Sequence, residues 1–294
     1  MCVSNLPSKF SNTKIFVSKV KDNHLLAYQM DFEQVGNDTG RRMMILQVPA
    51  TEIVALHDTT NYNGFLNDIY GQTSTYEYSY INGISKKPAA LDRGLLTSKS
   101  ITSHRVGMYE VLIVPSADEL ANLSRYVESD VPEISPEMIE FYKHYYGGFI
   151  FLCVLFEKTR SMSAQPFMVE YQGHPLYISD NGVDYEGLYV PAVDNETQGV
   201  HRGVPNLEQK VERNHLIAFP APNGLPIEYT QEVPEFLRFP MGFYRKEDYT
   251  QNGDFVIANR RIQVLPPSRY ESNPPSSWAA TVGEPSKKFN PHLG

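Results

Sequence analysis

Cys2 is the residue whose position most directly suggests catalytic chemistry. Removal of the initiator Met1, which a small second residue favours, would leave Cys2 at the N-terminus. Its thiolate could then attack a carbonyl carbon, with its own α-amino group, of pKa about 8, acting as the base. These features predict amide-bond hydrolysis as one function of the chain. The alternative is that Cys2 is a small side chain packed at the start of the first strand.

Histidine spacing does not predict a metal site. The chain has eight His residues, and no two of them show the four-residue spacing of helical zinc ligands. His174, Asp194, His201 and His215 fall in one strand-rich region and would form a site only if the fold brought them together. We therefore expect no metal and no other cofactor, and we interpret these histidines as solvated or hydrogen-bonded.

Other catalytic templates are absent from the sequence. It contains no Gly-x-Ser-x-Gly elbow, no Gly-x-x-x-x-Gly-Lys phosphate loop and no Gly-x-Gly-x-x-Gly after a strand. Tyrosines alternate in the segment 75–81, so Tyr76 and Tyr78 would line one face if this segment is a strand. We interpret that face as a surface for packing against protein, with a ligand-stacking platform as the alternative.

The elements that would position these residues are mostly β-strands. Segments rich in β-branched and aromatic residues predict strands, and those near the start of the chain are joined by short turns, as in an antiparallel meander. The predicted strands in the first half of the chain are 14–20, 25–32, 43–48, 109–114 and 149–156.

Two helices are expected in the middle of the chain. Ser116 lies three residues before Glu119, and this capping box predicts a helix over 118–129. A second helix is expected to begin after Ser135, with Pro136 at the first helical position. Together they form one helical pair between two strands.

Short strands broken by Pro and Gly follow the helical pair. Strands this closely spaced favour a sandwich or a strongly bent sheet. The sequence therefore predicts an α+β fold of β-rich antiparallel sheets with one helical pair. The strands expected in this part are 167–171, 175–179, 186–191, 214–219, 235–239 and 254–265.

The composition changes after Leu265. Residues 266–294 contain six Pro and five Ser in 29 positions, which favours an extended conformation. We therefore predict a globular body over 1–265 and an extended C-terminal arm over 266–294. The arm holds Trp278, the only Trp of the chain, between Tyr270 and Phe289. We interpret these aromatic residues as anchors that dock the arm on other protein subunits, with folding back onto the body and disorder as the alternatives.

Composition excludes several classes of protein. The net charge is −8 and there is no run of Lys or Arg, so binding to nucleic acid through its phosphates is not expected. Two Cys residues cannot make a disulfide framework. The longest apolar run, Phe149 to Phe156, is too short to span a membrane. The first ten residues lack the features of a signal peptide, so we expect an intracellular protein, cytoplasmic or inside a virus particle, and not a secreted one.

Several short phrases resemble those of a family of uncharacterised conserved proteins. The resemblance covers about residues 1–200 and implies a shared fold without indicating an activity. The phrases are Asn12-Thr13-Lys14-Ile15, Tyr28-Gln29-Met30, Met44-Ile45-Leu46-Gln47-Val48-Pro49, Tyr109-Glu110, Val114-Pro115-Ser116-Ala117-Asp118 and Tyr145-Tyr146-Gly147-Gly148-Phe149.

A second resemblance bears on Cys2. The segment Tyr28-Gln29-Met30-Asp31-Phe32 is similar to the segment after the first hairpin in the bile-salt-hydrolase branch of the N-terminal-nucleophile hydrolases. That branch needs an early Arg, and the first Arg of this chain is Arg41. The departure argues against this branch.

Two functions are therefore expected. The absence of catalytic templates and the aromatic residues of the arm favour a structural or assembly subunit of a larger complex, such as a minor capsid-associated component of a virion. The alternative is an amide hydrolase that uses Cys2 as its N-terminal nucleophile.

Overall fold

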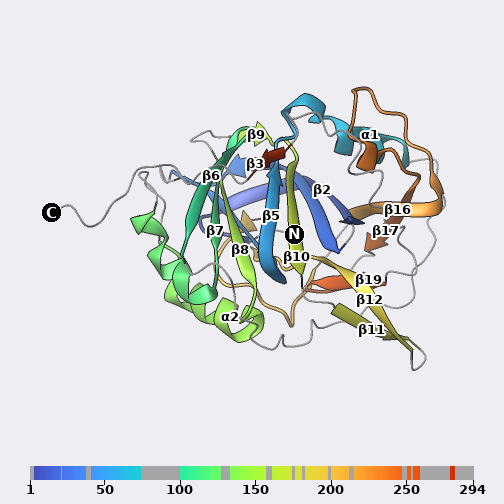
Figure 1. Cartoon of the computed structure of the whole chain (residues 1–294). Coiled ribbons are helices and arrows are strands. Elements are labelled where there is room, and N and C mark those ends of the chain that lie inside the picture. The colour runs from blue at the N-terminus through green and yellow to red at the C-terminus, as the bar shows by residue number, and fades with distance from the viewer. Residues whose placement is uncertain are drawn as a thin grey trace.

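The structure is a computed structural model of the whole chain (Figure 1). The residues that it describes are 3–20, 22–37, 41–73, 100–126, 133–156, 161–173, 176–180, 183–197, 200–211, 215–246, 250–252, 254–258 and 279–281.

One sheet has five antiparallel strands. They are, in spatial order, β1 (Val3–Ser4), β4 (Met43–Val48), β8 (Ile150–Leu155), β7 (Tyr109–Val114) and β6 (Thr102–Val106). Its central strand β8 is buried along its whole length, as its continuous apolar sequence predicts. This sheet thus brings the first described residues beside the middle of the chain.

The larger sheet has ten strands and is built around a long hairpin. That hairpin is β2 (Ser8–Val20) with β3 (Asn23–Gln34). The main path of this sheet places β13 (Glu196–Thr197), β14 (Val200–His201), β2, β3, β10 (Phe167–Gly173), β5 (Ala50–His57) and β20 (Ala279–Thr281) side by side, while β16 (His215–Leu225) with β17 (Met241–Lys246) joins β2, and β9 (Ser161–Ser163) joins β3.

Two small sheets and a few short helices complete the described elements. The small sheets are β11 (Leu176–Asp180), β12 (Val183–Val190) and β19 (Phe255–Ala258), and the pair β15 (Lys210–Val211) and β18 (Thr250–Gln251). The helices are η1 (Thr60–Tyr62), α1 (Phe65–Gly71), η3 (Ala117–Arg125), α2 (Pro136–Tyr146) and η4 (Glu235–Leu237).

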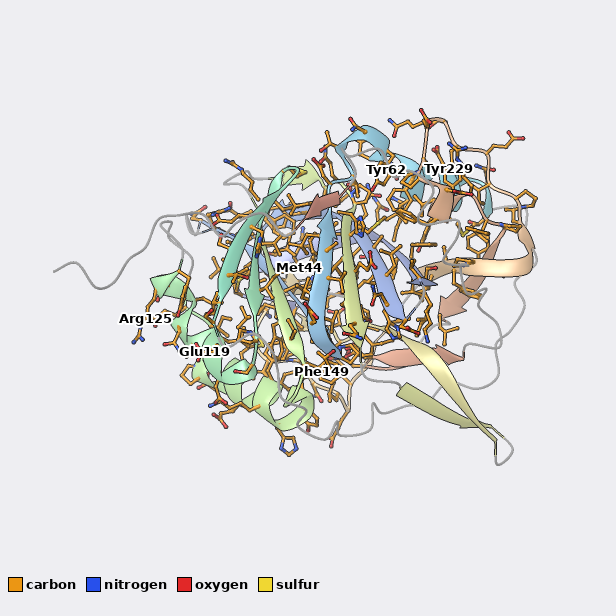
Figure 2. All side chains as sticks on the ribbon, in the orientation of Figure 1. Met44, Tyr62, Glu119, Arg125, Phe149 and Tyr229 are labelled. Carbon is orange, nitrogen blue, oxygen red and sulfur yellow. The ribbon has the colours of Figure 1, made fainter. Side chains whose placement is uncertain are left out.

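The two main sheets pack face to face, and helices cover both outer faces. Alternation along β4 shows the division, because Met44 and Leu46 point into the core between the sheets whereas Met43 and Ile45 point toward α2 and η3. Figure 2 shows Met44 near the centre of the molecule. On the other side, α1 and η4 cover the larger sheet through a third apolar cluster. The order of layers is therefore helices, sheet, sheet, helices.

The prediction of a β-rich α+β fold is confirmed. The start of the second helix is also confirmed, because Ser135 Oγ accepts a hydrogen bond from Met138 N at 3.2 Å and Pro136 is the first helical residue. The predicted strands 14–20, 25–32, 43–48, 109–114 and 149–156 match β2, β3, β4, β7 and β8 within a few residues.

The helix expected over 118–129 is a 3₁₀ helix, η3, and ends at Arg125. Its buried residues Ala117, Leu120 and Leu123 are each three positions apart, which is the period of a 3₁₀ helix and not of an α-helix. Ser116 makes no side-chain cap hydrogen bond. The three-residue repeat of apolar side chains favours this conformation. A helix in this segment is therefore confirmed, whereas the cap hydrogen bond expected from Ser116 is not formed.

The later strands follow the prediction with one exception. Five of the six expected segments overlap β10, β11, β12, β16 and β19, whereas 235–239 contains the 3₁₀ helix η4. Strand β5 and helix α1 were not expected. No helix among the described residues is long and apolar enough to cross a membrane.

Candidate functional site

The start of the chain is built into the fold by the side chain of Asn195. Val3 is fully buried and pairs with Ile45 of β4. Ser4 N donates a hydrogen bond to Asn195 Oδ1 at 3.3 Å, and Asn195 Nδ2 donates to Ser4 O at 3.1 Å. One amide side chain therefore holds both main-chain groups of a residue that lies 191 positions away in sequence.

A second Asn holds the neighbouring residue in the same way. Asp194 N donates to Asn252 Oδ1 at 3.0 Å, and Asn252 Nδ2 donates to Asp194 O at 2.6 Å. Arg202 N donates to Asn195 O at 3.1 Å. The four bonds that Asn195 and Asn252 make with Ser4 and Asp194 are buried, so the loss of one partner would leave a buried group unpaired. The loop after β12 is consequently fixed at Asp194 and Asn195.

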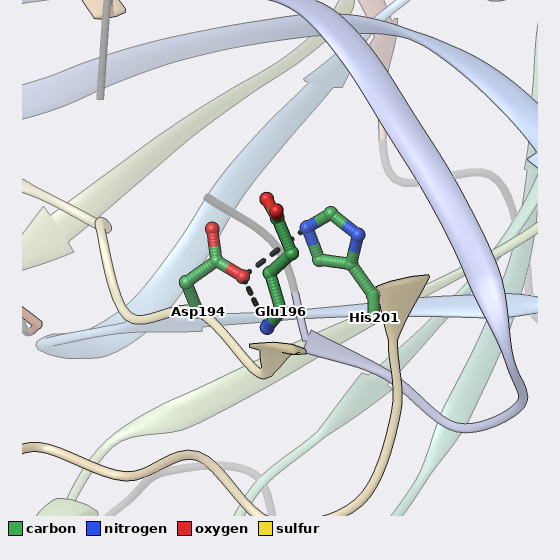
Figure 3. A group of neighbouring side chains, drawn as sticks. All are labelled: Asp194, Glu196 and His201. Carbon is green, nitrogen blue, oxygen red and sulfur yellow. Dashed lines mark hydrogen bonds and ion pairs between the residues drawn. The ribbon is translucent and has the colours of Figure 1, made fainter. Parts of the chain in front are cut away.

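Asp194, Glu196 and His201 form a compact group beside this loop (Figure 3). Glu196 and His201 are directly opposite in the β13–β14 pair, and His201 also pairs with Ser8 of β2. His201 Nε2 lies 3.1 Å from Asp194 Oδ1, and Glu196 N donates to the same oxygen at 2.7 Å. The three side chains each offer one ligand atom within 4.8 Å of the other two.

This group is largely buried and packs against an aromatic ring. The side chains of His201 and Asp194 are 2% and 4% exposed, and Glu196 is partly buried. The ring of Phe10 packs edge-on against the imidazole at a centroid distance of 4.8 Å. A low local dielectric strengthens charge interactions inside such a group and raises the cost of any charge left without a partner.

A second buried pair of His and carboxylate lies in the larger sheet. His57 Nε2 is 3.3 Å from Glu170 Oε2, and Asn23 Nδ2 donates to Glu170 Oε1 at 2.7 Å. Both oxygens of Glu170 thus have a partner, and the group connects β3, β10 and β5. We interpret it as structural.

The two Arg residues nearest the N-terminus in sequence lie close to the segment that follows β1. Met43 N donates to Asn5 Oδ1 at 2.9 Å, which places the start of β4 beside Asn5. Arg41 forms an ion pair with Glu110, and Arg42 is 3% exposed. The fold therefore buries an Arg next to the segment that follows Ser4, although the sequence has no Arg before position 41.

Only one of the two Cys residues, Cys153, lies in the part of the chain that the structure describes. Cys153 is fully buried in β8, and burial raises the pKa of its thiol, so it remains a protonated core residue as expected. Cys2 lies outside the described residues. The same is true of Tyr76, Tyr78, Tyr270, Trp278 and Phe289.

Of the four residues considered for convergence, the structure brings two together. Asp194 and His201 are neighbours, whereas His174 lies outside the described residues and His215 is placed only by its pairing with Lys246. The sequence pattern does not indicate Glu196 or Asn195 as site residues. Both lie in the polar run Asp194-Asn195-Glu196, which is the signal in the sequence that could have indicated them. Asn195 also begins an Asn-x-Thr sequon, but its side chain is buried, which indicates a structural role.

Comparisons of the chain with family models, with curated proteins and with solved structures find no match.

Proposed function

We propose that this protein is an amide-bond hydrolase whose nucleophile is Cys2 after removal of Met1. The observation that carries the proposal is the fixation of Ser4 by Asn195, because it builds strand β1, which follows Cys2 in sequence, into the core. Nucleophilic catalysis requires reacting groups held within a fraction of an ångström of the productive geometry. A strand held by β4 and by Asn195 provides such a support for the residues next to it.

The chemistry requires only groups that the mature N-terminus would carry. The free α-amino group takes the proton of the Cys2 thiol, and the sulfur attacks the amide carbon to form a C–S bond. The amine leaves with that proton when the C–N bond breaks. Water then cleaves the thioester, releasing the carboxylic acid and restoring the thiol. Each proton returns to the N-terminal amine or leaves with a product.

The test begins with the intact mass of the protein from its native source. The expected mass lacks Met1, and a retained Met1 would end the proposal. A thiol-reactive acylating probe should then label the native protein once, at Cys2. Cys2→Ala should lose the label, whereas Cys153→Ala should keep it because the Cys153 thiol is buried and protonated. Labelling that is unchanged in Cys2→Ala would contradict the assignment.

A variant of Asn195 tests whether the reactivity of the Cys2 thiol depends on how its strand is held, and not only on the presence of the thiol. Asn195→Ala leaves both main-chain groups of Ser4 without their side-chain partner. We expect the labelling rate at Cys2 to fall at least about tenfold while the folded protein persists, since a small misplacement of reacting groups has large effects on rate. An unchanged labelling rate would contradict the role given to Asn195.

We propose assembly as the second function, in which the C-terminal arm connects this chain to a larger complex, such as a virus particle. The observation that favours it is strand β20, because Ala279–Thr281 pairs with Ala55–His57 along β5. Strand addition to a sheet edge is a common mode of protein recognition, and an element that adds to its own edge can also be exchanged between copies.

Truncation after Leu265 tests the assembly proposal. It removes β20 together with Tyr270, Trp278 and Phe289 and uncovers the edge of β5. We expect a folded body that no longer enters the native complex, measured by size-exclusion chromatography with light scattering. A triple variant that replaces only the three aromatic residues with Ala retains the strand and serves as the control for the anchors. Unchanged assembly of the truncated chain would overturn the proposal.

A further inference from the structure

We infer that Asp194, Glu196 and His201 form a binding site for a divalent transition-metal cation, with Zn²⁺ as the probe that tests it (Figure 3). The inference goes beyond the proposed hydrolase because none of the three groups takes part in the chemistry assigned to Cys2. It rests on the identity of the ligand atoms, on their spacing and on the state of the imidazole.

The ligand atoms are those that Zn²⁺ binds in proteins. Zn²⁺ takes His nitrogen and carboxylate oxygen at about 2.0–2.2 Å, which separates two ligands of a tetrahedral ion by about 3.3 Å. His201 Nε2 and Asp194 Oδ1 are 3.1 Å apart, and the Glu196 carboxylate lies within 4.8 Å of both. A modest inward shift of the partly buried Glu196 side chain would complete the set. Three protein ligands leave the fourth position for water.

The imidazole supplies the second observation. His201 is 2% exposed, and neither ring nitrogen has a hydrogen-bond partner among the described residues. The contact of Nε2 with Asp194 has the distance of an ion pair without the geometry of a hydrogen bond. Figure 3 shows one ring nitrogen facing the two carboxylates. Buried polar atoms are nearly always paired, and among the described residues this nitrogen has only the Asp194 contact, which lacks hydrogen-bond geometry, so it has the position of a metal ligand.

Charge points to a cation at this position. Two carboxylates lie within 4.8 Å of each other in a largely buried group, and like charges this close repel strongly in a low dielectric. A divalent cation balances both carboxylates while the imidazole stays neutral, which is the form that ligates metals. The backbone of all three ligand residues is already fixed without a metal, because Asn252 binds the main chain of Asp194 and the β13–β14 pair holds Glu196 opposite His201.

The chain offers a matched control at the other buried pair. His57 and Glu170 have a similar contact of 3.3 Å and a similar burial, but Asn23 occupies the second oxygen of Glu170. If any buried His–carboxylate pair attracted Zn²⁺, both places would bind it. Glu170→Gln should therefore leave zinc binding unchanged, whereas Glu196→Gln and Asp194→Asn should weaken it.

The experiment is a titration of the chelator-treated full-length protein with Zn²⁺ in the Cys2→Ser background. This background excludes binding by the N-terminal thiol and separates the result from the fate of the hydrolase proposal. We expect one Zn²⁺ per chain at micromolar free metal, by calorimetry and by elemental analysis after dialysis. The thermal midpoint should rise with zinc concentration, since a ligand that binds only the folded state stabilises it.

Glu196→Gln is the decisive variant, because Glu196 is only partly buried and its substitution should leave the protein folded even if a change at the buried His201 does not. We expect Glu196→Gln to lower the zinc affinity at least about tenfold, a loss in the range seen when groups around a bound metal are removed. Absence of stoichiometric binding in the parent protein, or equal affinity in Glu196→Gln, would overturn the inference.

Discussion

At the scale of single residues, Asp254 joins segments that are far apart in sequence. Its carboxylate accepts hydrogen bonds from Gln47 of β4, from the Tyr189 hydroxyl of β12 and from the backbone N–H groups of Ala192 and Val193. The side chain is almost fully buried, so these donors have no access to water in its place. One carboxylate thus holds the end of β12 against the five-stranded sheet, directly before the loop that carries Asp194 and Asn195.

Replacement of Asp254 by Ala should strongly reduce the free energy of unfolding. The change leaves several buried donors unpaired at once, and such losses cost about 3–5 kcal/mol. Urea denaturation followed by far-UV circular dichroism measures the effect. Asp118→Ala is the control, because the Asp118 carboxylate is exposed and pairs with Lys143 at the surface, so a change below about 0.5 kcal/mol is expected. A loss at Asp254 no larger than at Asp118 would contradict the role described.

At the scale of elements, the two helical segments of the middle region differ at their N-termini. Ser135 accepts a hydrogen bond from Met138 N and opens the α-helix α2, whereas Ser116 makes no such bond and opens the 3₁₀ helix η3. Both serines precede helical residues, yet the hydroxyl satisfies a free backbone N–H only at α2. The two positions therefore form a natural pair for measuring the cap.

Ser135→Ala should lower the free energy of unfolding by about 1 kcal/mol, which is the typical contribution of a side-chain N-cap. Ser116→Ala should change it by less than about 0.5 kcal/mol, because no cap hydrogen bond is lost there. Equilibrium urea denaturation of the two variants in parallel gives both values. Equal losses at the two serines would show that the cap of α2 does not contribute as the geometry indicates.

The sequence predicts those elements whose signals are local. β8 is a continuous apolar run, and α2 carries its cap and its first-turn Pro136, so both are recognised. Helix α1 is missed because it has seven residues and follows Gly64 without a side-chain cap. β5 is missed because Pro49 ends β4 as expected, but the chain re-enters a strand at Ala50.

The site is harder to predict because its contacts are not local. Asp194 and His201 were singled out, but their meeting depends on the β13–β14 register, and strands of two residues leave no periodic pattern. The hydrogen bonds between Asn195 and Ser4 join residues that lie 191 positions apart in sequence. Residue types alone indicate which groups can ligate or hydrogen-bond, whereas the sheet order decides which of them meet.

At the scale of the whole molecule, tyrosine side chains are buried in each of the three apolar clusters between the four layers. Burial raises the pKa of several phenol groups in the folded state. Tyr62, Tyr109, Tyr171 and Tyr189 are buried, and Tyr70 and Tyr229 are partly buried. Tyr62 and Tyr229 lie near α1 in Figure 2. In the unfolded chain these groups would lose their protons at pH about 10. Titration of the buried tyrosines is therefore coupled to unfolding of the whole body.

The protein should consequently lose stability as the pH rises above about 10. A phenol with a raised pKa in the folded state contributes its full stability below the unfolded value. Above that value the unfolded chain releases protons that the folded chain retains, so the free energy of unfolding falls with pH. Each such tyrosine adds a slope of about 1.4 kcal/mol per pH unit, and the buried Cys153 thiol acts in the same direction.

Urea denaturation at successive pH values between 8 and about 11 measures this slope, and the absorbance of tyrosinate reports the titration. We expect the absorbance of the buried tyrosines to appear together with the loss of far-UV circular dichroism. Tyr171→Phe should reduce the alkaline slope by the contribution of about one proton, while the parent slope below pH 9 stays the same. A gradual titration of all tyrosines in a protein that remains folded would show that the buried phenols reach water without unfolding, and would contradict the closed packing of the two sheets.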